Sequence, residues 1–416
     1  MTLLMRGEIM STAYTYKPWY EERWKDNWVP EEVAVDCYST FACRHKFCRE
    51  VCPVYQETGN EGHSSYSFHV SLLSVARGYS KLRELGDTFT YCLQCGACQL
   101  RCPTTLFTGD FYKITNEHNV LVTKTRKELI DLGFKFKGAD GMIDNLTKVV
   151  NDTDAGKLPV AEWAKDLNLP ETGEVILFVD YFMATQMTNI LRLVATVLKK
   201  AGVDFGIVKD PKPVFTYELD YLGEKGVAYA KHNLETLKKT GAKKVIVPDP
   251  HVFVSLTKEY PRLLKEDPPF DVVYVTDFVA ELIREGKLKP EKPVKKKVTY
   301  HDSCMLNKVS GIWNSPREIL NSIPGIEFID EDHVSQWYYC CGNGASEVRS
   351  FKTLHEDLSY RIGLKRLRRA LDLEVTTLAL TCPHCNEQFS EVKVKSNLNI
   401  EIIDVFELLA DSLGLR

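Results

Sequence analysis

The sequence predicts an α+β multidomain protein, in which a helical N-terminal domain is followed by two pseudo-symmetric α/β lobes. Three observations lead to this fold class. The 13 cysteines of the 416-residue chain fall into two groups, between Cys37 and Cys102 and between Cys304 and Cys385. From about Glu174 the hydrophobic pattern alternates between that of strands and that of helices. The order of these strands and helices then occurs a second time, which indicates a duplicated α/β unit.

The composition is that of a globular protein without a large charge imbalance. Hydrophobic residues make up 44% of the chain, charged residues 26%, and the formal net charge is -4, so nothing favours nucleic acid as a partner. The first 20 residues lack an apolar core of signal-peptide length, and Asp180 and Arg192 interrupt the most apolar later stretch. We therefore expect a cytoplasmic protein that reaches the inner face of a membrane only through a partner. An odd number of clustered cysteines favours metal binding over a disulfide framework.

Residues 1–34 are expected to form an N-terminal arm that packs onto another part of the protein. They carry no motif and are rich in aromatic side chains: Trp19, Tyr20, Trp24 and Trp28.

The stretch "CLQCGACQLRCP" at residues 92–103 has the spacing of a cubane iron–sulfur site. Cys92, Cys95 and Cys98 are two residues apart, so one loop can wrap a cluster and give each thiolate a different iron. The small residues Gly96 and Ala97 let backbone amides approach the sulfides. Cys102, which Pro103 follows, points elsewhere, and in ferredoxins with two clusters this fourth thiolate binds the other cluster.

The partner motif lies upstream in "CYSTFACRHKFCREVCP". Its last gap has the expected three residues, but the two earlier gaps have five and four where the pattern has two. A bulged loop could accommodate them, Cys37 could drop out of the ligand set, or the cluster could hold three irons. Zinc is the alternative for both motifs, although the string CxxCxxCxxxCP is far more specific for a cubane. We assign one cluster to Cys52, Cys92, Cys95 and Cys98, and the other to Cys37, Cys43, Cys48 and Cys102.

The sequence between the two motifs indicates that this first domain is helical. The 39 residues between Cys52 and Cys92 include the helical stretch "SYSFHVSLLSVARGYSKLREL". We therefore predict a helical dicluster [4Fe-4S] ferredoxin-like domain over residues 35–115, followed by a helical connector over residues 116–173.

The two α/β lobes are predicted over residues 174–290 and 291–416. "EVILFV" and "KKVIVPD" have the pattern of buried strands, and "TNILRLVATVLKKAG" that of an amphipathic helix. The two copies end in "VVYVTDFVAEL" and "NIEIIDVFELL", where Asp277 and Asp404 are expected to cap the helices that follow. The stretch "EGKLKPEKPVKKK" between the copies is expected to be a solvated linker. Two such lobes suggest a site in the cleft between them.

The second copy carries the remaining cysteines in "HDSC", "CCGNG" and "TCPHC", with 35 residues between Cys304 and Cys340 and 40 between Cys341 and Cys382. Here the chain resembles the proteins with cysteine-rich CCG domains. They include the catalytic subunits of heterodisulfide reductase and the iron–sulfur subunits of glycolate oxidase, lactate-utilisation and anaerobic glycerol-3-phosphate dehydrogenase complexes. The resemblance covers about residues 35–416. It implies a dicluster ferredoxin followed by two CCG lobes.

The resemblance also implies a noncubane [4Fe-4S] cluster in the C-terminal lobe. Each motif follows a strand or begins a helix, so the loops should meet at one edge of the sheet. Adjacent thiolates at positions 340 and 341 can bridge two irons, and Gly342 leaves room beside them. A structural zinc and a vicinal disulfide are the alternatives. His301, Asp302 and His384 could donate protons, but hydrogen bonds to ligands or helix caps are favoured. The implied cluster ligands are Cys304, Cys340, Cys341, Cys382 and Cys385.

The first copy has lost every thiol of this pattern. Tyr181 stands in place of Cys304, "VFT" at residues 214–216 in place of the CCG, and Asp249 and Val252 in place of the last two cysteines. This copy is expected to keep the fold without a cluster. The chain should therefore carry two cubane clusters and one noncubane cluster.

Two functions agree with these motifs. In the first, the chain is the electron-transfer subunit of a flavin-linked dehydrogenase or a heterodisulfide reductase-like complex, and its cubane clusters relay electrons to or from the C-terminal cluster. In the second, that cluster itself reduces or forms a disulfide. The lost thiols of the first copy favour the relay, and a zinc scaffold would leave the ferredoxin string unexplained. The expected partners are a flavoprotein dehydrogenase subunit and a membrane or quinone-linked carrier, because the chain has no nucleotide-binding fingerprint.

Overall fold

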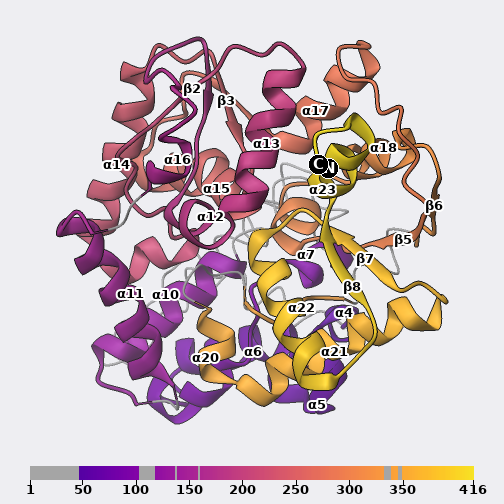
Figure 1. The fold of residues 1–416 in the computed structure, drawn as a ribbon. Coiled ribbons are helices and arrows are strands. Elements are labelled where there is room, and N and C mark those ends of the chain that lie inside the picture. Colours follow the sequence, from indigo (N-terminus) through magenta and orange to yellow (C-terminus); the bar gives the residue numbers. More distant parts are fainter. Residues whose placement is uncertain (1–45, 103–117, 136–137, 158–159, 332–338, 345–348) are drawn as a thin grey trace, which may run out of the picture. The chain divides into compact units, whose positions relative to one another are not determined.

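The computed structural model describes residues 46–102, 118–135, 138–157, 160–331, 339–344 and 349–416. These residues form two compact units, shown in Figure 1. The first unit comprises the described residues up to Cys92 and from Cys98 to residue 135, and the second comprises Leu93–Ala97 and those from residue 138 onwards. The aromatic arm, Cys37, Cys43 and Pro103 lie outside the described residues.

The described part of the first unit is helical, as the sequence predicts. Pro53 occupies the first position of α5, where its fixed φ suits a helix start, and Gly59 ends that helix with a φ of 63°. Ser64 accepts a hydrogen bond from the amide of Ser67 (3.3 Å) and thereby caps α6, which covers the first half of the predicted helical stretch. The helices of this region are α4 (Cys48–Val51), α5 (Pro53–Thr58), α6 (Ser65–Ala76), α7 (Ala97–Arg101) and α10 (His118–Asp131).

The second unit contains two four-stranded parallel sheets, which confirms the α+β class. The first sheet has the order β2-β1-β3-β4 and the second the order β6-β5-β7-β8, so each follows the same sequence of pairings. In the register, Ile176 pairs with Gly206 on one side and Val245 on the other. The strands are β1 (Val175–Leu177), β2 (Gly206–Ile207), β3 (Lys244–Val247), β4 (Asp271–Tyr274), β5 (Lys296–Tyr300), β6 (Ile326–Phe328), β7 (Thr377–Leu380) and β8 (Glu401–Asp404).

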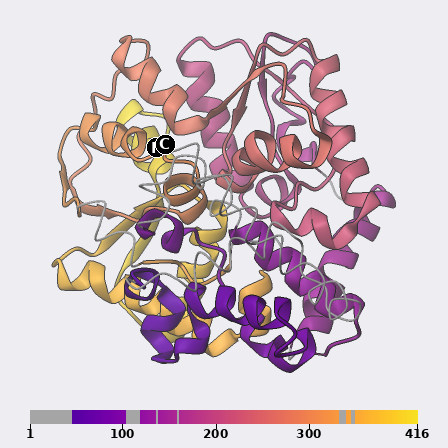
Figure 2. The same ribbon diagram turned by 180° about the vertical axis from the view of Figure 1, so that it is seen from behind.

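Helices connect these strands, because parallel neighbours require crossovers. Figure 1 shows α13 and α14 on opposite sides of the first sheet, and Figure 2 shows the same arrangement from behind. In α13, buried residues such as Leu191, Val194 and Leu198 recur at helical spacing, and Gly202 follows with a φ of 73°. The helices are α11 (Ala139–Asp154), α12 (Tyr181–Gln186), α13 (Thr188–Lys200), α14 (Glu224–Lys239), α15 (Pro250–Val254), α16 (Tyr260–Leu264), α17 (Val275–Arg284), α18 (Asn314–Ser322), α20 (Ser350–Leu354), α21 (Glu356–Asp372), α22 (Pro383–Ser396) and α23 (Val405–Leu413).

The lobes built on the two sheets share one hydrophobic core. All four residues of β7 are buried, as expected for a parallel strand covered on both faces. Polar contacts also join the lobes: the Tyr274 hydroxyl donates to the carbonyl oxygen of Thr381 (2.7 Å), and Thr276 and Ser315 share a hydrogen bond (2.8 Å). These contacts join the last residue of β4 to the residue that follows β7, and α17 to α18.

One of the two predicted helix caps is confirmed and the other is wrong. Asp404 caps α23 by accepting from the amide of Phe406 (2.8 Å), while Glu407 accepts from the amide of Asp404 (3.1 Å). Asp277 does not cap α17, because that helix begins two residues earlier, at Val275. In the first lobe the helix begins directly after the last residue of β4, so Asp277 lies inside its first turn.

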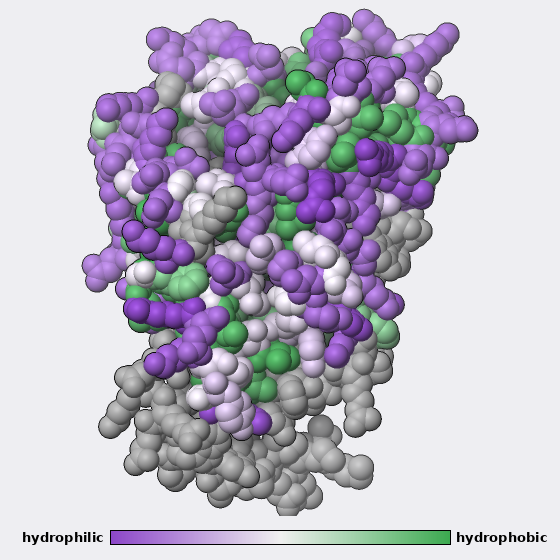
Figure 3. Space-filling view, turned by 90° about the horizontal axis from the view of Figure 1, so that it is seen from below, coloured by the Kyte–Doolittle hydropathy of each residue, from purple (hydrophilic) through white to green (hydrophobic). Residues whose placement is uncertain are grey.

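The face of the molecule in Figure 3 is mostly polar. Figure 3 shows a face on which hydrophilic residues dominate and apolar residues form small groups. Among the described residues, no helix is long and apolar enough to cross a bilayer.

Replacing Asp404 by alanine should lower the free energy of unfolding by about 1 kcal/mol, because the first turn of α23 loses its cap. Burial raises the pKa of Asp404 to about 8, so its carboxyl is mostly protonated at neutral pH and Asp404→Asn should retain the stability. Urea-induced unfolding of the full chain measures both variants. Asp372→Ala, at the last residue of α21, is the control and should cost nothing. Equal stabilities for Asp404→Ala and the wild type would contradict the assigned cap.

Candidate metal centre

All five cysteines of the second group lie close together in the second unit, and all are buried. Cys304 begins a π-helical turn just after β5, and Cys382 and Cys385 lie at the N-terminus of α22 just after β7. Cys340 and Cys341 come from the loop before Gly342. The thiols therefore collect at the carboxyl ends of two adjacent parallel strands, where open α/β folds place their ligands.

Hydrogen bonds connect these five side chains into one group. Cys340 contacts Cys304, Cys341 and also Cys95 of the first group, and Cys385 contacts Cys341 and Cys382. The hydrogen bond with Cys340, together with burial, raises the pKa of Cys304, whereas hydrogen bonds from Cys340 and Cys385 lower the pKa of Cys341. Thiols in hydrogen-bond contact cannot all ionise without a cation, because their negative charges repel one another. Thiolates are the form of cysteine that binds metal. The group therefore has the donor chemistry of a metal site.

Two buried cations lie around the cysteines. Lys308 donates to the carbonyl oxygen of Tyr339, and Arg366, which is fully buried, donates to that of Tyr300 (2.8 Å). Burial and the charges of these two residues lower the pKa of His301. Buried positive charge is costly unless negative charge lies nearby. The buried carboxylate of Glu331 lies 3.3 Å from Arg366, and a cluster held by thiolates would supply negative charge near Lys308.

Several buried polar atoms near the cysteines have no hydrogen-bond partner in the structure. They are both ring nitrogens of His301, the hydroxyl of Ser303 and both side-chain polar atoms of Asn343. Such atoms are rare in folded proteins and call for a bound group. The sulfides of an iron–sulfur cluster accept hydrogen bonds. The residues present thus fit such a cluster.

Two glycines allow helix α21 to pack directly against the cysteine loop. Gly342 has a φ of 91°, and a Cβ there would lie 2.3 Å from the carbonyl oxygen of Ser359. A Cβ on Gly363 would lie 2.7 Å from the carbonyl oxygen of Cys341. A side chain at either position would displace the loop that carries Cys340 and Cys341.

Asp302 stabilises the loop between β5 and Cys304. Its two carboxylate oxygens accept hydrogen bonds from Arg317 (2.9 and 2.7 Å), and both residues are buried. Asp302 is therefore bound in an ion pair beside the cysteines.

Residues of the first lobe reach the cysteine group, and the sequence analysis did not select them. His251 forms a hydrogen bond with Cys382. Cys382 also contacts the neighbouring Cys385. The signal was available, since "DPH" at residues 249–251 occupies the place of "CPH" at residues 382–384. Asp249 is the N-cap residue of α15, and Cys382 is the N-cap residue of α22. The two tripeptides therefore hold equivalent positions after β3 and β7.

The structure describes six of the eight cysteines of the first group. Positive φ angles at Gln94 (54°) and Gly96 (72°) fold the chain tightly around Cys95, which is buried. The other five are partly buried: Cys48, Cys52, Cys92, Cys98 and Cys102.

In the first unit, three buried polar residues support the loop at Cys92, and the sequence analysis missed them as well. The fully buried Arg126 donates to the carbonyl oxygens of Phe89 (2.8 Å), Thr90 (2.9 Å) and Cys92 (2.7 Å). The ring of His118 lies 3.7 Å from the sulfur of Cys92 and 2.9 Å from His69. Burial, with the nearby charges of His69 and Arg126, lowers the pKa of His118. Little in the sequence could have identified these three residues, because single polar residues on α6 and α10 form no motif.

Two family models match the chain. A 4Fe-4S dicluster domain matches residues 37–106, and a cysteine-rich domain, CCG, matches residues 298–390. Together these matches support iron–sulfur clusters as the cofactors.

Curated relatives are oxidoreductases and their subunits. One component of the dihydromethanophenazine:CoB–CoM heterodisulfide reductase of Methanosarcina mazei is 28% identical over 392 residues, which cover 89% of this chain and 92% of the relative. The EtfAB:quinone oxidoreductase of Syntrophomonas wolfei is 26% identical over 343 residues, 78% of this chain and 46% of the relative. A hypothetical protein from Helicobacter pylori has a similar fold, with a TM-score of 0.55 and 13% identity over 93% of this chain and 77% of that chain.

Replacing Gly342 by alanine should remove the C-terminal cluster, because the new Cβ collides with backbone of α21. We expect the anaerobically purified variant to lose about four irons per chain, together with the matching sulfide. Gly202→Ala is the control: its φ of 73° is similarly unfavourable, but a Cβ there meets nothing within 4 Å. This control should keep all its iron. Full iron content in Gly342→Ala would show that the cluster does not depend on this loop.

Proposed function

Since the chain is an iron–sulfur oxidoreductase subunit that joins a 4Fe-4S dicluster domain to a CCG cysteine-rich domain, we propose that it relays electrons between a flavoprotein and a C-terminal cluster. In this proposal, two cubane clusters in the domain at residues 35–115 carry single electrons to or from the CCG site. The buried group of five thiols in the second unit is the observation that carries the proposal.

We assign the cluster ligands as follows. Cys92, Cys95, Cys98 and Cys52 hold one cubane, and Cys48, Cys102, Cys43 and Cys37 hold the other. The five buried thiols of the second unit hold a noncubane [4Fe-4S] cluster. The adjacent thiolates of Cys340 and Cys341 support this last assignment, since neighbouring residues bridge two irons more readily than they chelate one.

The two lobes, at residues 174–290 and 291–416, are proposed to be pseudo-symmetric copies, linked to the ferredoxin domain by the connector at 116–173. The equal strand orders of the two sheets support this, as do the equivalent positions of Asp249 and Cys382 at helix N-termini. Only the second copy retains thiols. A chain with one CCG cluster is better suited to relaying electrons than to chemistry that uses two such clusters.

The protein's own residues hold the C-terminal cluster and set its environment. When bound, the cluster supplies one-electron exchange. The buried charge of Lys308 helps to balance its negative charge, and His301 and Asn343 are placed to donate hydrogen bonds to it. Both effects favour the reduced state, because each stabilises additional negative charge.

The proposed partners are a flavoprotein dehydrogenase subunit and a quinone-linked or membrane-bound carrier. The names of the relatives support this, since one is an EtfAB:quinone oxidoreductase and another belongs to a heterodisulfide reductase. The protein would work in the cytoplasm, at the inner face of the membrane when bound to such a carrier.

The second candidate is disulfide reduction at the C-terminal cluster itself. The resemblance to the heterodisulfide reductase component of Methanosarcina mazei, over nearly the whole chain, favours it. Buried histidines also adjoin the ligands: His251 contacts Cys382, and His384 lies between Cys382 and Cys385 in sequence.

Metal analysis tests the cofactor assignment. The anaerobically purified chain should contain about twelve irons with an equal amount of sulfide, or about eleven irons if the cluster at Cys37 holds three. Cys98→Ser and Cys341→Ser should each remove one EPR signal, from a cubane and from the C-terminal cluster respectively. A protein with zinc and no sulfide would refute the iron–sulfur assignment altogether.

Steady-state assays separate relay from catalysis. With reduced methyl viologen as the donor, the isolated chain should reduce the CoB–CoM heterodisulfide no faster than a cluster-free control, while its cubane clusters accept electrons within the mixing time. Cys341→Ser should leave the reduction of the cubanes unchanged. Robust turnover that Cys341→Ser abolishes would instead establish the catalytic candidate.

A further inference from the structure

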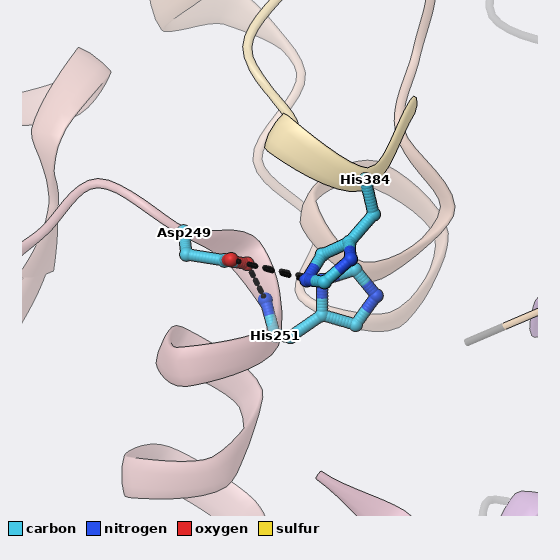
Figure 4. Close-up of side chains that lie close together, drawn as sticks. All are labelled: Asp249, His251 and His384. Atoms are coloured by element: carbon cyan, nitrogen blue, oxygen red, sulfur yellow. Dashed lines mark hydrogen bonds and ion pairs between the residues drawn. The ribbon is translucent and has the colours of Figure 1, made fainter. Parts of the chain in front are cut away.

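A second group of metal-binding side chains lies beside the cysteines and contains none of them. It consists of Asp249 and His251 from the first lobe and His384 from the second. Figure 4 shows the three side chains pointing toward one another from the N-termini of α15 and α22. One ligand atom of each lies within 4.8 Å of the others, and the three residues are 0 to 2% exposed.

The polar atoms in this group are incompletely satisfied. Asp249 Oδ1 accepts from the backbone amide (2.7 Å) and Nδ1 (3.0 Å) of His251, and Oδ2 forms a longer ion pair with Nε2 of His384 (3.4 Å). Nδ1 of His384 has no hydrogen-bond partner. Buried polar atoms are nearly always paired at normal hydrogen-bond distance, so the unpaired Nδ1 and the long contact between Asp249 and His384 leave these groups available to a bound species.

The spacing of these atoms suits a small cation. His251 Nδ1 lies 3.0 Å from Asp249 Oδ1, and His384 Nε2 lies 3.4 Å from Asp249 Oδ2. Ligands at about 2.0–2.1 Å from a tetrahedral ion stand about 3.3 Å apart. Two imidazoles and one carboxylate are a typical ligand set for Zn²⁺ and Fe²⁺.

The electrostatics of the group also favour a cation. Asp180 is fully buried, and burial together with the charge of Asp249 raises its pKa to about 6. Its carboxylate accepts hydrogen bonds from the amides of Phe182 (3.2 Å) and Met183 (3.1 Å), so it caps α12 and is not one of the ligands. Two neighbouring carboxylates closed off from water create a negative potential that a divalent ion would relieve.

We propose that Asp249, His251 and His384 bind one divalent ion of the zinc class, which joins the two lobes beside the CCG site. The ion is separate from the iron–sulfur clusters, and the proposal does not depend on the relay function. The first lobe has no cysteines, but it contributes two of the ligands, Asp249 and His251. The second lobe completes the site with His384.

Zinc titration of the full chain, purified without oxygen and with its clusters intact, tests this site. After brief treatment with a chelator, Zn²⁺ is added in competition with a chromophoric chelator, and we expect one tight site per chain. Asp249→Asn should bind Zn²⁺ more than about tenfold more weakly. Removing a residue that only hydrogen-bonds to a metal ligand already costs about tenfold or more in affinity, and removing the ligand itself should cost at least as much. Asparagine still caps α15, so the fold should persist.

Asp180→Asn is the matched control, because it makes the same change at a neighbouring buried helix cap outside the ligand set. It should weaken Zn²⁺ binding far less than Asp249→Asn does, because it removes a neighbouring charge but no ligand. Iron and sulfide, measured in every sample, should be equal in the wild type and both variants.

Zinc K-edge X-ray absorption of the wild type decides the ligands without any variant. We expect a shell of nitrogen and oxygen at about 2.0–2.2 Å. A sulfur shell at about 2.3 Å would place the zinc on cysteines and overturn the proposal. The absence of a tight site, or an unchanged affinity in Asp249→Asn, would overturn it too.

Discussion

The burial of five thiols in one place is the constraint on which the second unit depends. Thiolates this close repel one another, and burial removes the water that would screen them. A positively charged group bound among them lets all five thiols ionise together, and the buried cation Lys308 adds to that compensation. The site is therefore built for a bound cluster, and binding that cluster contributes to folding.

The parallel sheets explain how such distant residues meet. Cys304 and Cys382 each follow a strand, and β5 and β7 are neighbours in the sheet. Because the strands run parallel, their carboxyl ends open on the same edge. Gly342 and Gly363 then let α21 approach the remaining loop closely enough to bring Cys340 and Cys341 to that edge. The first sheet brings Asp249 and His251 to its own edge in the same way.

In the first unit, buried polar side chains hold the cysteine loop. Arg126 donates to three backbone carbonyl groups, and its charge lies beside Cys92. A buried guanidinium next to a thiolate ligand stabilises negative charge there, which is one way a protein sets the potential of a cluster. Both units thus combine a short cysteine motif with cations from distant helices.

The sequence by itself determined the α+β class, the helix α6, the strands β1 and β3 and the cap at Asp404, because hydrophobic period and helix capping are local properties. It also selected every cysteine, since ligand spacing within a loop is local too. The tertiary structure alone decided the start of α17, which begins at Val275, so that Asp277 does not cap it. It alone revealed Arg126, His118, Lys308, Arg366 and the group of Asp249, His251 and His384. These residues act through contacts between segments far apart in the chain, and a single sequence carries no record of which distant segments touch.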